Sequence, residues 1–360
     1  MIYIDASRYG NTEQRTGVER YSHELIDELV RTHAQEIVLI APKKIDLPVS
    51  QITIPFPRLW THVRLSWEAL MNKTIDNLFV PSHVLPLISP KKSVITIHDV
   101  AFCRFPESYG FWSRLYLKWS TQFAVSHATT LIVPSQATQE DLIAFFKAAP
   151  EKIRVIPHGH TPQKKGIDPA ASERLLKQHS LNRKKYFFTI GRIETKKNLL
   201  VLIEVFKRFV ADHQDYKLVL AGKDGVGHEA IHAAAKAAPN IIFLDYVEER
   251  TKSALFAAAA AFVFPSLYEG FGFPLLEAME YGLPIIASDI PSSREAAEGA
   301  AVFFVPTDAD ALEKQLKKII TESEDHDFHL HPTPQKQKGI LQRYSWQRCA
   351  EETWKVLTND

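Results

Sequence analysis

The sequence has little cysteine and no long apolar run. Its 360 residues include two cysteines, Cys103 and Cys349, which are too few for a disulfide framework, so we expect both thiols to stay reduced. No stretch approaches about 18 consecutive apolar residues, and the start, Met1 to Asp5, lacks the layout of a signal peptide. We therefore expect a cytoplasmic protein without a transmembrane helix.

The chain also lacks an excess of charge of either sign. It has 43 Lys and Arg against 42 Asp and Glu, a formal net charge of +1. Proteins that bind nucleic acid usually carry a basic face and a high isoelectric point, so we expect no nucleic-acid partner. Hydrophobic residues make up 45% of the chain, enough for two cores, and this length suits two domains better than one.

Short apolar runs alternate with helical patterns from end to end, which predicts parallel α/β sheets. A polar stretch, residues 160 to 183, interrupts the alternation after Gly159. We therefore place a domain boundary near residue 160, with a ligand cleft between the two domains. The strands are expected at Ile2–Ile4, Ile37–Ala41, Leu78–Val80, Val94–Ile97, Thr130–Val133, Ile153–Ile156, Tyr186–Ile190, Leu218–Ala221, Ile241–Leu244, Phe262–Phe264, Ile285–Ala287 and Val302–Val305.

The most informative segment runs from Glu269 to Glu277, two carboxylates with seven residues between them. Its Gly270 and Gly272 let the backbone approach a ligand closely, and Pro274 suits the first turn of a helix whose unpaired amides favour an anion. A phosphate could bind there, with Glu277 accepting hydrogen bonds from a ribose diol. An exposed acidic loop before an ordinary surface helix also fits this pattern.

A second informative segment follows the predicted strand that ends at Ile190. It reads Gly-Arg-Ile-Glu-Thr-Lys-Lys-Asn over residues 191 to 198 and leads into an apolar helix, Leu199 to Val210. In open α/β sheets ligands bind at the carboxyl ends of strands, and Arg192 with Lys197 is a sensible clamp for a diphosphate. Lys196 and Lys197 also fit a solvated pair, although a helix N-terminus is electrostatically unfavourable for cations.

Together these segments resemble the retaining nucleotide-sugar glycosyltransferases of glycosyltransferase family 4. The likeness rests on the Gly-Arg-x4-Lys-Asn and Glu-Gly-Phe-Gly-x-Pro-x-x-Glu motifs, and on the turn and strand from Gly282 to Ser288. It implies the GT-B fold: two Rossmann-like doubly wound α/β domains with an interdomain cleft. Residues 1–160 would bind the acceptor and residues 161–342 the donor, and a last helix at about residues 343–360 would return to the first domain.

The resemblance also implies a role for individual residues of this sequence. Arg192 and Lys197 would bind the donor diphosphate, Glu277 the ribose, and Glu269 the donor sugar together with the backbone from Phe271 to Phe273. The donor-binding set implied in this way is Gly17, Gly191, Tyr246, Val247, Gly270, Phe271, Gly272, Phe273 and Glu277, with His98, Arg192, Lys197 and Glu269 as the catalytic set.

Two of these assignments, His98 and Gly17, carry specific reservations. His98 follows the strand that ends at Ile97 and, by resemblance, contacts the donor sugar; a histidine hydrogen-bonded at a strand end is the alternative. Gly17 stands where family members often have paired glycines, and Thr16 replaces one of them. Tyr246 and Val247 fall where the family places the nucleotide base.

Other motifs have structural explanations that we prefer. Gly222, Gly225 and Gly227 have the spacing of a turn rather than of a dinucleotide fingerprint. Asp308-Ala-Asp310 reads as a helix N-cap with a first-turn acid. The three histidines between residues 326 and 331 lack the framework of a zinc site. We therefore predict that no metal and no cofactor is required.

Two segments bear on the surface and on the chain's end. Arg58 to Arg64 with Trp67 could contact a membrane peripherally, on its inner face, although an ordinary connection with a buried Trp67 is the preferred interpretation. Residues 321–338 are polar and are expected to be a linker. The alanine runs at residues 233–238 and 257–261 are expected to be helical.

The predicted reaction moves a hexose from a nucleoside-diphosphate sugar, GDP-mannose or a UDP-hexose, to a hydroxyl of a glycan or lipid-linked acceptor. Retention is implied by the resemblance alone, in which the acceptor attacks on the face of the leaving group and a phosphate oxygen takes its proton. The segment from Thr16 to Leu25 resembles enzymes of bacterial surface-polysaccharide assembly. The alternatives are a nucleotide-sugar epimerase on the same fold and a non-catalytic sugar-nucleotide-binding protein.

Overall fold

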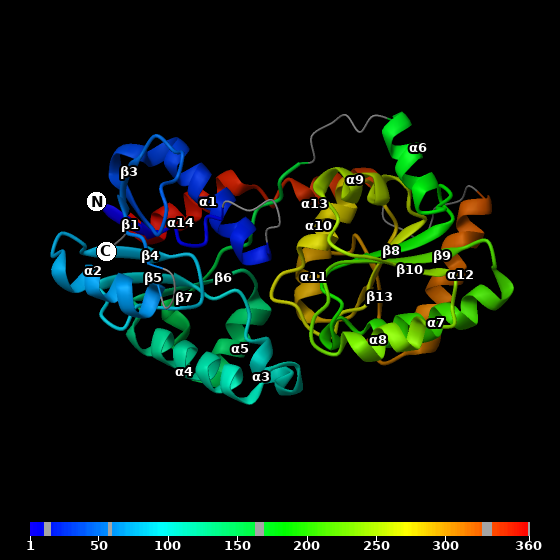
Figure 1. Ribbon diagram of the computed structural model, residues 1–360, viewed down its shortest axis with the longest axis horizontal. Coiled ribbons are helices and arrows are strands. Elements are labelled where there is room, and N and C mark those ends of the chain that lie inside the picture. Colours follow the sequence, from blue (N-terminus) through cyan, green and yellow to red (C-terminus); the bar gives the residue numbers. More distant parts are fainter. Residues whose placement is uncertain (11–15, 57–59, 163–168, 326–332, 359–360) are drawn as a thin grey trace. The chain divides into compact units, whose positions relative to one another are not determined.

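The computed structural model describes residues 1–10, 16–56, 60–162, 169–325 and 333–358. The chain forms two compact units, each built around its own parallel sheet (Figure 1). Unit 1 comprises Met1–Gly159 and Tyr344–Asp360, and unit 2 comprises His160–Arg343.

The sheet of unit 1 has seven strands in the order β3-β2-β1-β4-β5-β6-β7, all paired in parallel. The inner strands are apolar and buried because helices cover both faces of the sheet. Only β3 was missed by the sequence, because this edge strand is polar and half exposed. The strands are β1 (Ile2–Asp5), β2 (Ile37–Ala41), β3 (Ser50–Thr53), β4 (Asn77–Val80), β5 (Lys92–Thr96), β6 (Thr130–Val133) and β7 (Ile153–Val155).

The first helix of unit 1 begins at a capping box. The Thr16 hydroxyl accepts from the Glu19 amide, and the Glu19 carboxylate accepts from the Thr16 amide. The α-helices of this unit are α1 (Gly17–His33), α2 (Ser66–Met71), α3 (Ala101–Arg104), α4 (Phe111–His127), α5 (Gln136–Phe146) and α14 (Trp346–Thr358). Short 3-10 or π turns are η1 (Ala34–Glu36), η2 (Trp60–Leu65), η3 (Pro106–Ser108) and η4 (Pro150–Lys152).

The C-terminal helix α14 belongs to unit 1, as the resemblance implied. It packs on α1, where the rings of Trp354 and His33 stack with centroids 3.8 Å apart. The Asn77 side chain donates a 2.7 Å hydrogen bond to the Leu357 carbonyl and so joins the end of α14 to the sheet. The chain therefore leaves unit 1 at Gly159 and returns to it at Tyr344.

The sheet of unit 2 has six parallel strands in the order β10-β9-β8-β11-β12-β13. Its core is rich in phenylalanine: Phe187 on β8 packs against Phe206 and Phe209 of α7. The strands are β8 (Tyr186–Ile190), β9 (Lys217–Ala221), β10 (Ile241–Leu244), β11 (Ala261–Phe264), β12 (Ile285–Ser288) and β13 (Val302–Phe304). The helices are α6 (Pro169–Gln178), α7 (Leu199–Asp212), α8 (His228–Ala235), α9 (Glu249–Ala258), α10 (Phe273–Glu280), α11 (Pro291–Ala297), α12 (Ala309–Asp325) and α13 (Pro334–Leu341), with the 3-10 turn η5 (Thr195–Lys197).

The linker predicted over residues 321–338 is wrong. Helix α12 continues to Asp325, and α13 begins at Pro334; residues 326–332 lie outside the described part of the chain. Helix α13 packs on α10, and its fully buried Gln337 donates a 2.7 Å hydrogen bond to the Leu283 carbonyl. The polar composition misled the prediction because only three side chains of this helix are buried, Ile340, Leu341 and the polar Gln337.

Two further predictions need correction. The alanine run at residues 257–261 is helical only to Ala258, and Ala261 already starts β11, because pairing in a buried sheet outweighs the weak helical preference of alanine. Likewise α8 ends at Ala235. Trp67 is not buried but 57% exposed on α2. Within the described part of the chain, no helix combines the length and the apolar character needed to cross a bilayer.

We expect Gly159→Ala to destabilise unit 1 by about 2–3 kcal/mol, because an added methyl group would force the packing around α14 apart. A Cβ at Gly159 would lie 2.4 Å from the backbone nitrogen of Trp346 and 2.5 Å from its indole ring. Urea unfolding followed by circular dichroism measures the change. Gly110→Ala is the matched control, since nothing lies within 4 Å of its added Cβ; equal losses in both variants would contradict this account of how α14 is held.

Candidate functional site

The predicted donor-binding residues of unit 2 gather at the carboxyl edge of its sheet. Strand order reverses beside β8, because the chain passes to β9 on one side and β11 lies on the other. Such a reversal opens a crevice between the loops that follow the two strands. A pocket is found there, lined among others by Gly191, Arg192, Lys197, Pro265 and Ser266.

The loop after β8 is held by backbone hydrogen bonds to the loop after β9. The Gly191 amide donates to Ala221, the Ile193 amide to Lys223, and the Thr195 amide to Val226, at 2.9 to 3.0 Å. Asn198 then adopts a left-handed conformation (φ 56°) at the start of α7, and its side chain donates to the Pro306 carbonyl. The clamp predicted from Gly191 to Asn198 is thus an ordered loop.

The glycines after β9 are needed for this close contact between loops. A Cβ at Gly222 would lie 1.9 Å from the Gly191 carbonyl oxygen, and one at Gly227 would lie 2.1 Å from the Thr195 hydroxyl oxygen. Both residues also have positive φ angles, 142° and 83°. Their spacing therefore reflects packing against the clamp loop, a contact between separate segments that the sequence pattern does not reveal.

Lys197 and Glu269 meet at the pocket from two different loops. The Lys197 ammonium lies 2.5 Å from Glu269 Oε1, and the Ser266 hydroxyl donates to the same oxygen at 2.7 Å. The two charged side chains are only 16% and 14% exposed, so their interaction is weakly screened by solvent. Sequence reasoning assigned these residues to different parts of the donor and missed both their pairing and Ser266.

Arg192 lies on the rim of the same pocket. Its backbone is fixed by the strand end, and its exposed guanidinium donates to the Asp224 carbonyl at 3.2 Å. Arg192 and Lys197 thus bring two cations to the pocket, one exposed at the rim and one largely shielded from solvent in an ion pair.

The segment from Gly270 to Glu277 forms the bend and helix that its sequence predicts. Gly272 caps α10 with φ 113°, and Phe271 packs edge-to-face on Phe273 with ring centroids 5.4 Å apart. The expectation that the first amides of α10 are unpaired is wrong for Leu275, whose amide donates to the Gly272 carbonyl at 3.0 Å. Pro274 has no amide hydrogen, so this helix start offers fewer donors than predicted.

Glu277 is buried inside unit 2 and paired with a lysine that the sequence analysis missed. Its Oε1 accepts from Lys252 Nζ at 2.8 Å, and both side chains are less than 10% exposed. Lys252 also reaches Glu249 at 2.7 Å, one turn earlier on α9. No pattern in the sequence connects Lys252 to Glu277, because the two lie on separate helices.

Tyr246 and Val247 are half buried between β10 and α9, at the same edge of the sheet. The Lys223 ammonium lies 5.5 Å from the centroid of the Tyr246 ring, a cation–π contact. Their predicted place beside a nucleotide base stays a prediction.

Two predicted site residues belong to unit 1. Gly17 is the first residue of α1 and is exposed beside the Thr16 cap. His98 follows β5 and is buried, with Nε2 3.3 Å from the Pro81 carbonyl and Nδ1 3.3 Å from Nε2 of His158. Because a carbonyl can only accept, Nε2 of His98 carries the proton and Nδ1 accepts from His158.

Burial lowers the pKa of His98 to about 3, with a further contribution from His83, and burial also lowers the pKa of His158. His98 is therefore neutral at physiological pH, and both ring nitrogens are engaged within unit 1. This arrangement matches the alternative of a histidine hydrogen-bonded at a strand end; its predicted contact with a donor sugar stays a prediction.

The Asp308-Ala-Asp310 motif is a helix cap, as predicted. Asp308 accepts from the Ala311 amide at 2.8 Å, and Asp310 pairs with Arg208 on the surface. Among the residues that the structure describes, no cluster of His, Cys, Asp and Glu has the geometry of a metal site. The three histidines between residues 326 and 331 lie outside that part of the chain.

Comparison with known families identifies two matching segments. Residues 15–164 match the model described as Glycosyltransferase Family 4, and residues 172–329 match that described as Glycosyl transferases group 1. The second segment lies within unit 2, and the first ends five residues beyond Gly159, the last residue of unit 1 before the boundary.

Among curated relatives, an O-antigen chain mannosyltransferase B of Escherichia coli is 26% identical over 269 residues, covering 73% of this chain and 69% of that protein. The O-antigen chain mannosyltransferase RfbU of Salmonella typhimurium is 25% identical, covering 66% of this chain and 63% of RfbU. The match thus spans less than two thirds of RfbU, and 59% of an uncharacterized glycosyltransferase of Methanocaldococcus jannaschii.

Solved structures with the same fold include the lipopolysaccharide glycosyltransferase WaaG, at a TM-score of 0.73 and 17% identity, with both chains fully covered. HepE of Anabaena in complex with UDP-glucose has a TM-score of 0.73 and 18% identity, covering 100% of this chain and 99% of HepE.

We expect Lys252→Met to destabilise the protein by about 3 kcal/mol, because it leaves the buried Glu277 carboxylate without its partner. Urea unfolding measures the loss, with the exposed Lys314→Met as control. The double variant Lys252→Met/Glu277→Leu should recover most of the stability, since it removes both buried charges together. A double variant that loses as much as the two single variants combined would refute the coupling.

We expect stability to fall on acidification in a manner that depends on His98 and His158. Their folded-state pKa values lie below the unfolded value of 6.5, so their contribution is present above pH 6.5 and is lost as pH falls toward the folded values. The slope should be at least about 1.4 kcal/mol per pH unit below pH 6.

The measurement is urea unfolding between about pH 7 and 4.5, compared with the variant His98→Gln/His158→Gln. Burial raises the pKa of Asp5, which acts in the opposite direction, so the difference between the two proteins isolates the histidines. Parallel pH profiles for the two proteins would show that the histidines do not cause the slope.

Proposed function

Because the chain belongs to glycosyltransferase family 4 and has the GT-B fold, we propose that it is a retaining hexosyltransferase of surface-polysaccharide assembly. It would move a hexose from a nucleoside-diphosphate sugar to a hydroxyl of a glycan or lipid-linked acceptor. The observation that carries the proposal is the ion pair between Lys197 and Glu269. It lies at the pocket beside β8, where the strand order of the unit 2 sheet reverses.

The ion pair has the two chemical functions that a sugar nucleotide requires. A diphosphate bound in the pocket would form an ion pair with the Lys197 ammonium, and the Arg192 guanidinium would contact the same diphosphate from the rim. Glu269, released from its cation, would accept hydrogen bonds from sugar hydroxyls while Ser266 still holds one of its oxygens. The Lys197–Glu269 ion pair would therefore exchange for two ligand contacts of matching charge and polarity.

The reaction breaks the bond between the anomeric carbon and the leaving phosphate oxygen, and it forms a bond from that carbon to the acceptor oxygen. The acceptor proton passes to a phosphate oxygen, so no side-chain base is needed. Fixed cations at Lys197 and Arg192 stabilise the developing charge of the diphosphate, a role for which we propose that no metal is required. Retention of configuration is part of the proposal and comes from the family.

The nucleoside would lie toward α9 and α10. Glu277 has one oxygen held by Lys252, which keeps the carboxylate in place for a ribose diol. Tyr246 and Val247 would flank the base. The names of the relatives favour a mannosyl donor and HepE favours UDP-glucose, so GDP-mannose and UDP-hexoses are the donors to test first.

We expect Lys197→Ala and Glu269→Ala each to lower kcat/KM for the best donor by about a hundredfold or more, because each removes a group that acts at the reacting bond. The assay is a nucleotide-sugar panel scored for released nucleoside diphosphate, with and without glycan and lipid-linked acceptors. A chelator should leave the rate unchanged.

The matched controls are Lys207→Ala and Glu204→Gln, exposed residues of α7 outside the pocket. Native rates in both site variants would show that the site is misassigned. Conversion of the donor without an acceptor would instead indicate an epimerase, and donor binding without release of diphosphate would indicate a non-catalytic binding protein.

A further inference from the structure

Exposed apolar side chains are concentrated on one part of unit 1. Of the sixteen large hydrophobic side chains exposed among the described residues, eleven lie between residues 63 and 119. They include every exposed tryptophan: Trp67, Trp112 and Trp119, which are 57%, 77% and 48% exposed. We call this set the apolar face; its other members are Val63, Leu70, Met71, Leu87, Ile88, Phe111, Leu115 and Tyr116.

Printed contacts join the elements that carry the apolar face. His62 on η2 lies 2.7 Å from the Tyr116 hydroxyl on α4, and its ring lies 5.6 Å from that of Trp119. The Ser66 hydroxyl at the start of α2 accepts from the Leu87 amide at 2.8 Å. Helices α2 and α4, η2 and the loop before β5 therefore lie against one another within unit 1.

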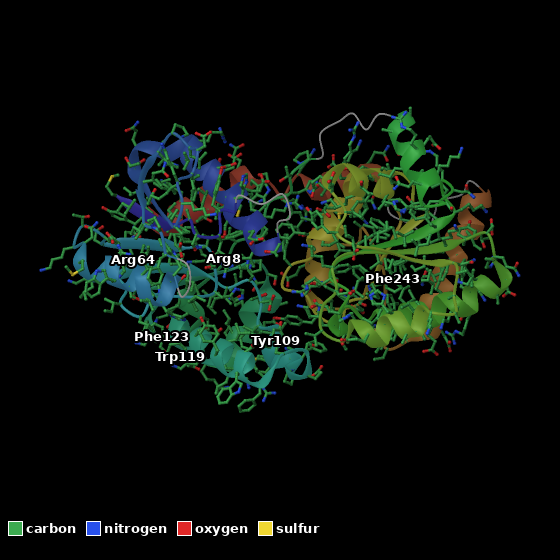
Figure 2. The ribbon with its side chains drawn as sticks, in the orientation of Figure 1. Arg8, Arg64, Tyr109, Trp119, Phe123 and Phe243 are labelled. Atoms are coloured by element: carbon green, nitrogen blue, oxygen red, sulfur yellow. The ribbon has the colours of Figure 1, made fainter. Side chains whose placement is uncertain are left out.

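Helix α4 projects from the unit at its N-terminal half. From Phe111 to Trp119 no side chain is buried, whereas Ser120, Thr121, Ala124 and Val125 in the second half pack into the domain. Trp119 stacks on Phe123 along this helix with centroids 5.9 Å apart (Figure 2). Apolar patches of this extent on a protein surface mark a place of interaction.

The charges around the apolar face are predominantly positive. Helix α4 contains no Asp or Glu in its 17 residues, but it carries Arg114 and Lys118 within the projecting half. Residues 58–127 hold eight Lys and Arg against four Asp and Glu, although the whole chain is balanced. The nearby Glu68 is already paired with Arg64 at 3.0 Å.

This composition matches the interface of an anionic bilayer. Tryptophan and tyrosine favour the boundary between acyl chains and headgroups, and Lys and Arg beside them are attracted to acidic lipids. Leu117 packs this half of α4 against the core of unit 1, while Trp112 and Trp119 stay exposed, so these side chains can enter that boundary without a complementary groove. A protein partner would need such a groove and acidic groups of its own.

We propose that the apolar face docks the protein on an anionic membrane surface, with Trp112 and Trp119 entering the headgroup boundary and Arg114 and Lys118 contacting lipid phosphates. This surface lies entirely within unit 1 and shares no residue with the donor pocket of unit 2. The docking is therefore independent of the proposed donor chemistry, and either can fail without the other.

The test is sedimentation of the full chain with vesicles of phosphatidylglycerol and phosphatidylethanolamine, and with vesicles of phosphatidylcholine alone. Trp112→Ser/Trp119→Ser should lower partitioning at least about tenfold on the anionic vesicles. Arg114→Gln/Lys118→Gln should lower it about 25-fold at low salt, about fivefold per charge, and should have little effect on the neutral vesicles. Brominated lipid should quench tryptophan fluorescence in the native protein and much less in the tryptophan variant.

The control Lys314→Gln/Lys338→Gln makes the same change in net charge on exposed lysines of unit 2 and should bind as the native protein does. Circular dichroism and donor turnover without vesicles establish that each variant is folded. The proposal is overturned if the native protein stays in the supernatant, or if both pairs of variants bind like it. It is also overturned if the native protein instead self-associates through residues lost in the tryptophan variant.

Discussion

The contact between Lys197 and Glu269 is the interaction on which the donor unit depends. It joins the loop after β8 to the loop after β11, and both loops emerge where the strand order of the sheet reverses. A second link, from the Leu267 amide to the Lys196 carbonyl at 2.9 Å, fixes the same two loops through their backbones. The backbone contacts thus fix the positions of both charged side chains. A bound ligand would replace the ion pair with its own contacts to Lys197 and Glu269, and the two loops would not have to rearrange.

Much of the fold followed from periodicity, because buried parallel strands are continuous apolar runs. The strands at Ile37–Ala41, Thr130–Val133 and Ile241–Leu244 have the predicted bounds. The polar edge strand at Ser50–Thr53 and the helix from Pro334 escaped, since the strand has no buried side chain and the helix buries only Gln337, Ile340 and Leu341. Local pattern thus predicts elements with a long apolar stripe, and it fails for those held by edge pairing or by few buried side chains.

The candidate site shows the same division. The bend and helix around Gly272 were predictable because positive φ angles and helix starts have residue preferences. The charged partners were not, because Lys252 reaches Glu277 and Lys197 reaches Glu269 only through the tertiary fold. His98 shows a further limit: its neighbours Pro81 and His158 decide which ring nitrogen carries the proton, and neither adjoins it in sequence.

The close approach of Gly222 to Gly191 limits which residues near the donor site of this enzyme can be substituted. No side chain fits between the two loops, so Gly222 cannot be enlarged without displacing the loop that carries Gly191 and Arg192. Tyr246 and Val247, in contrast, lie half buried on a loop that is not packed in this way. Attempts to change the donor by directed evolution should therefore randomise the residues after β10 and leave Gly222 unchanged.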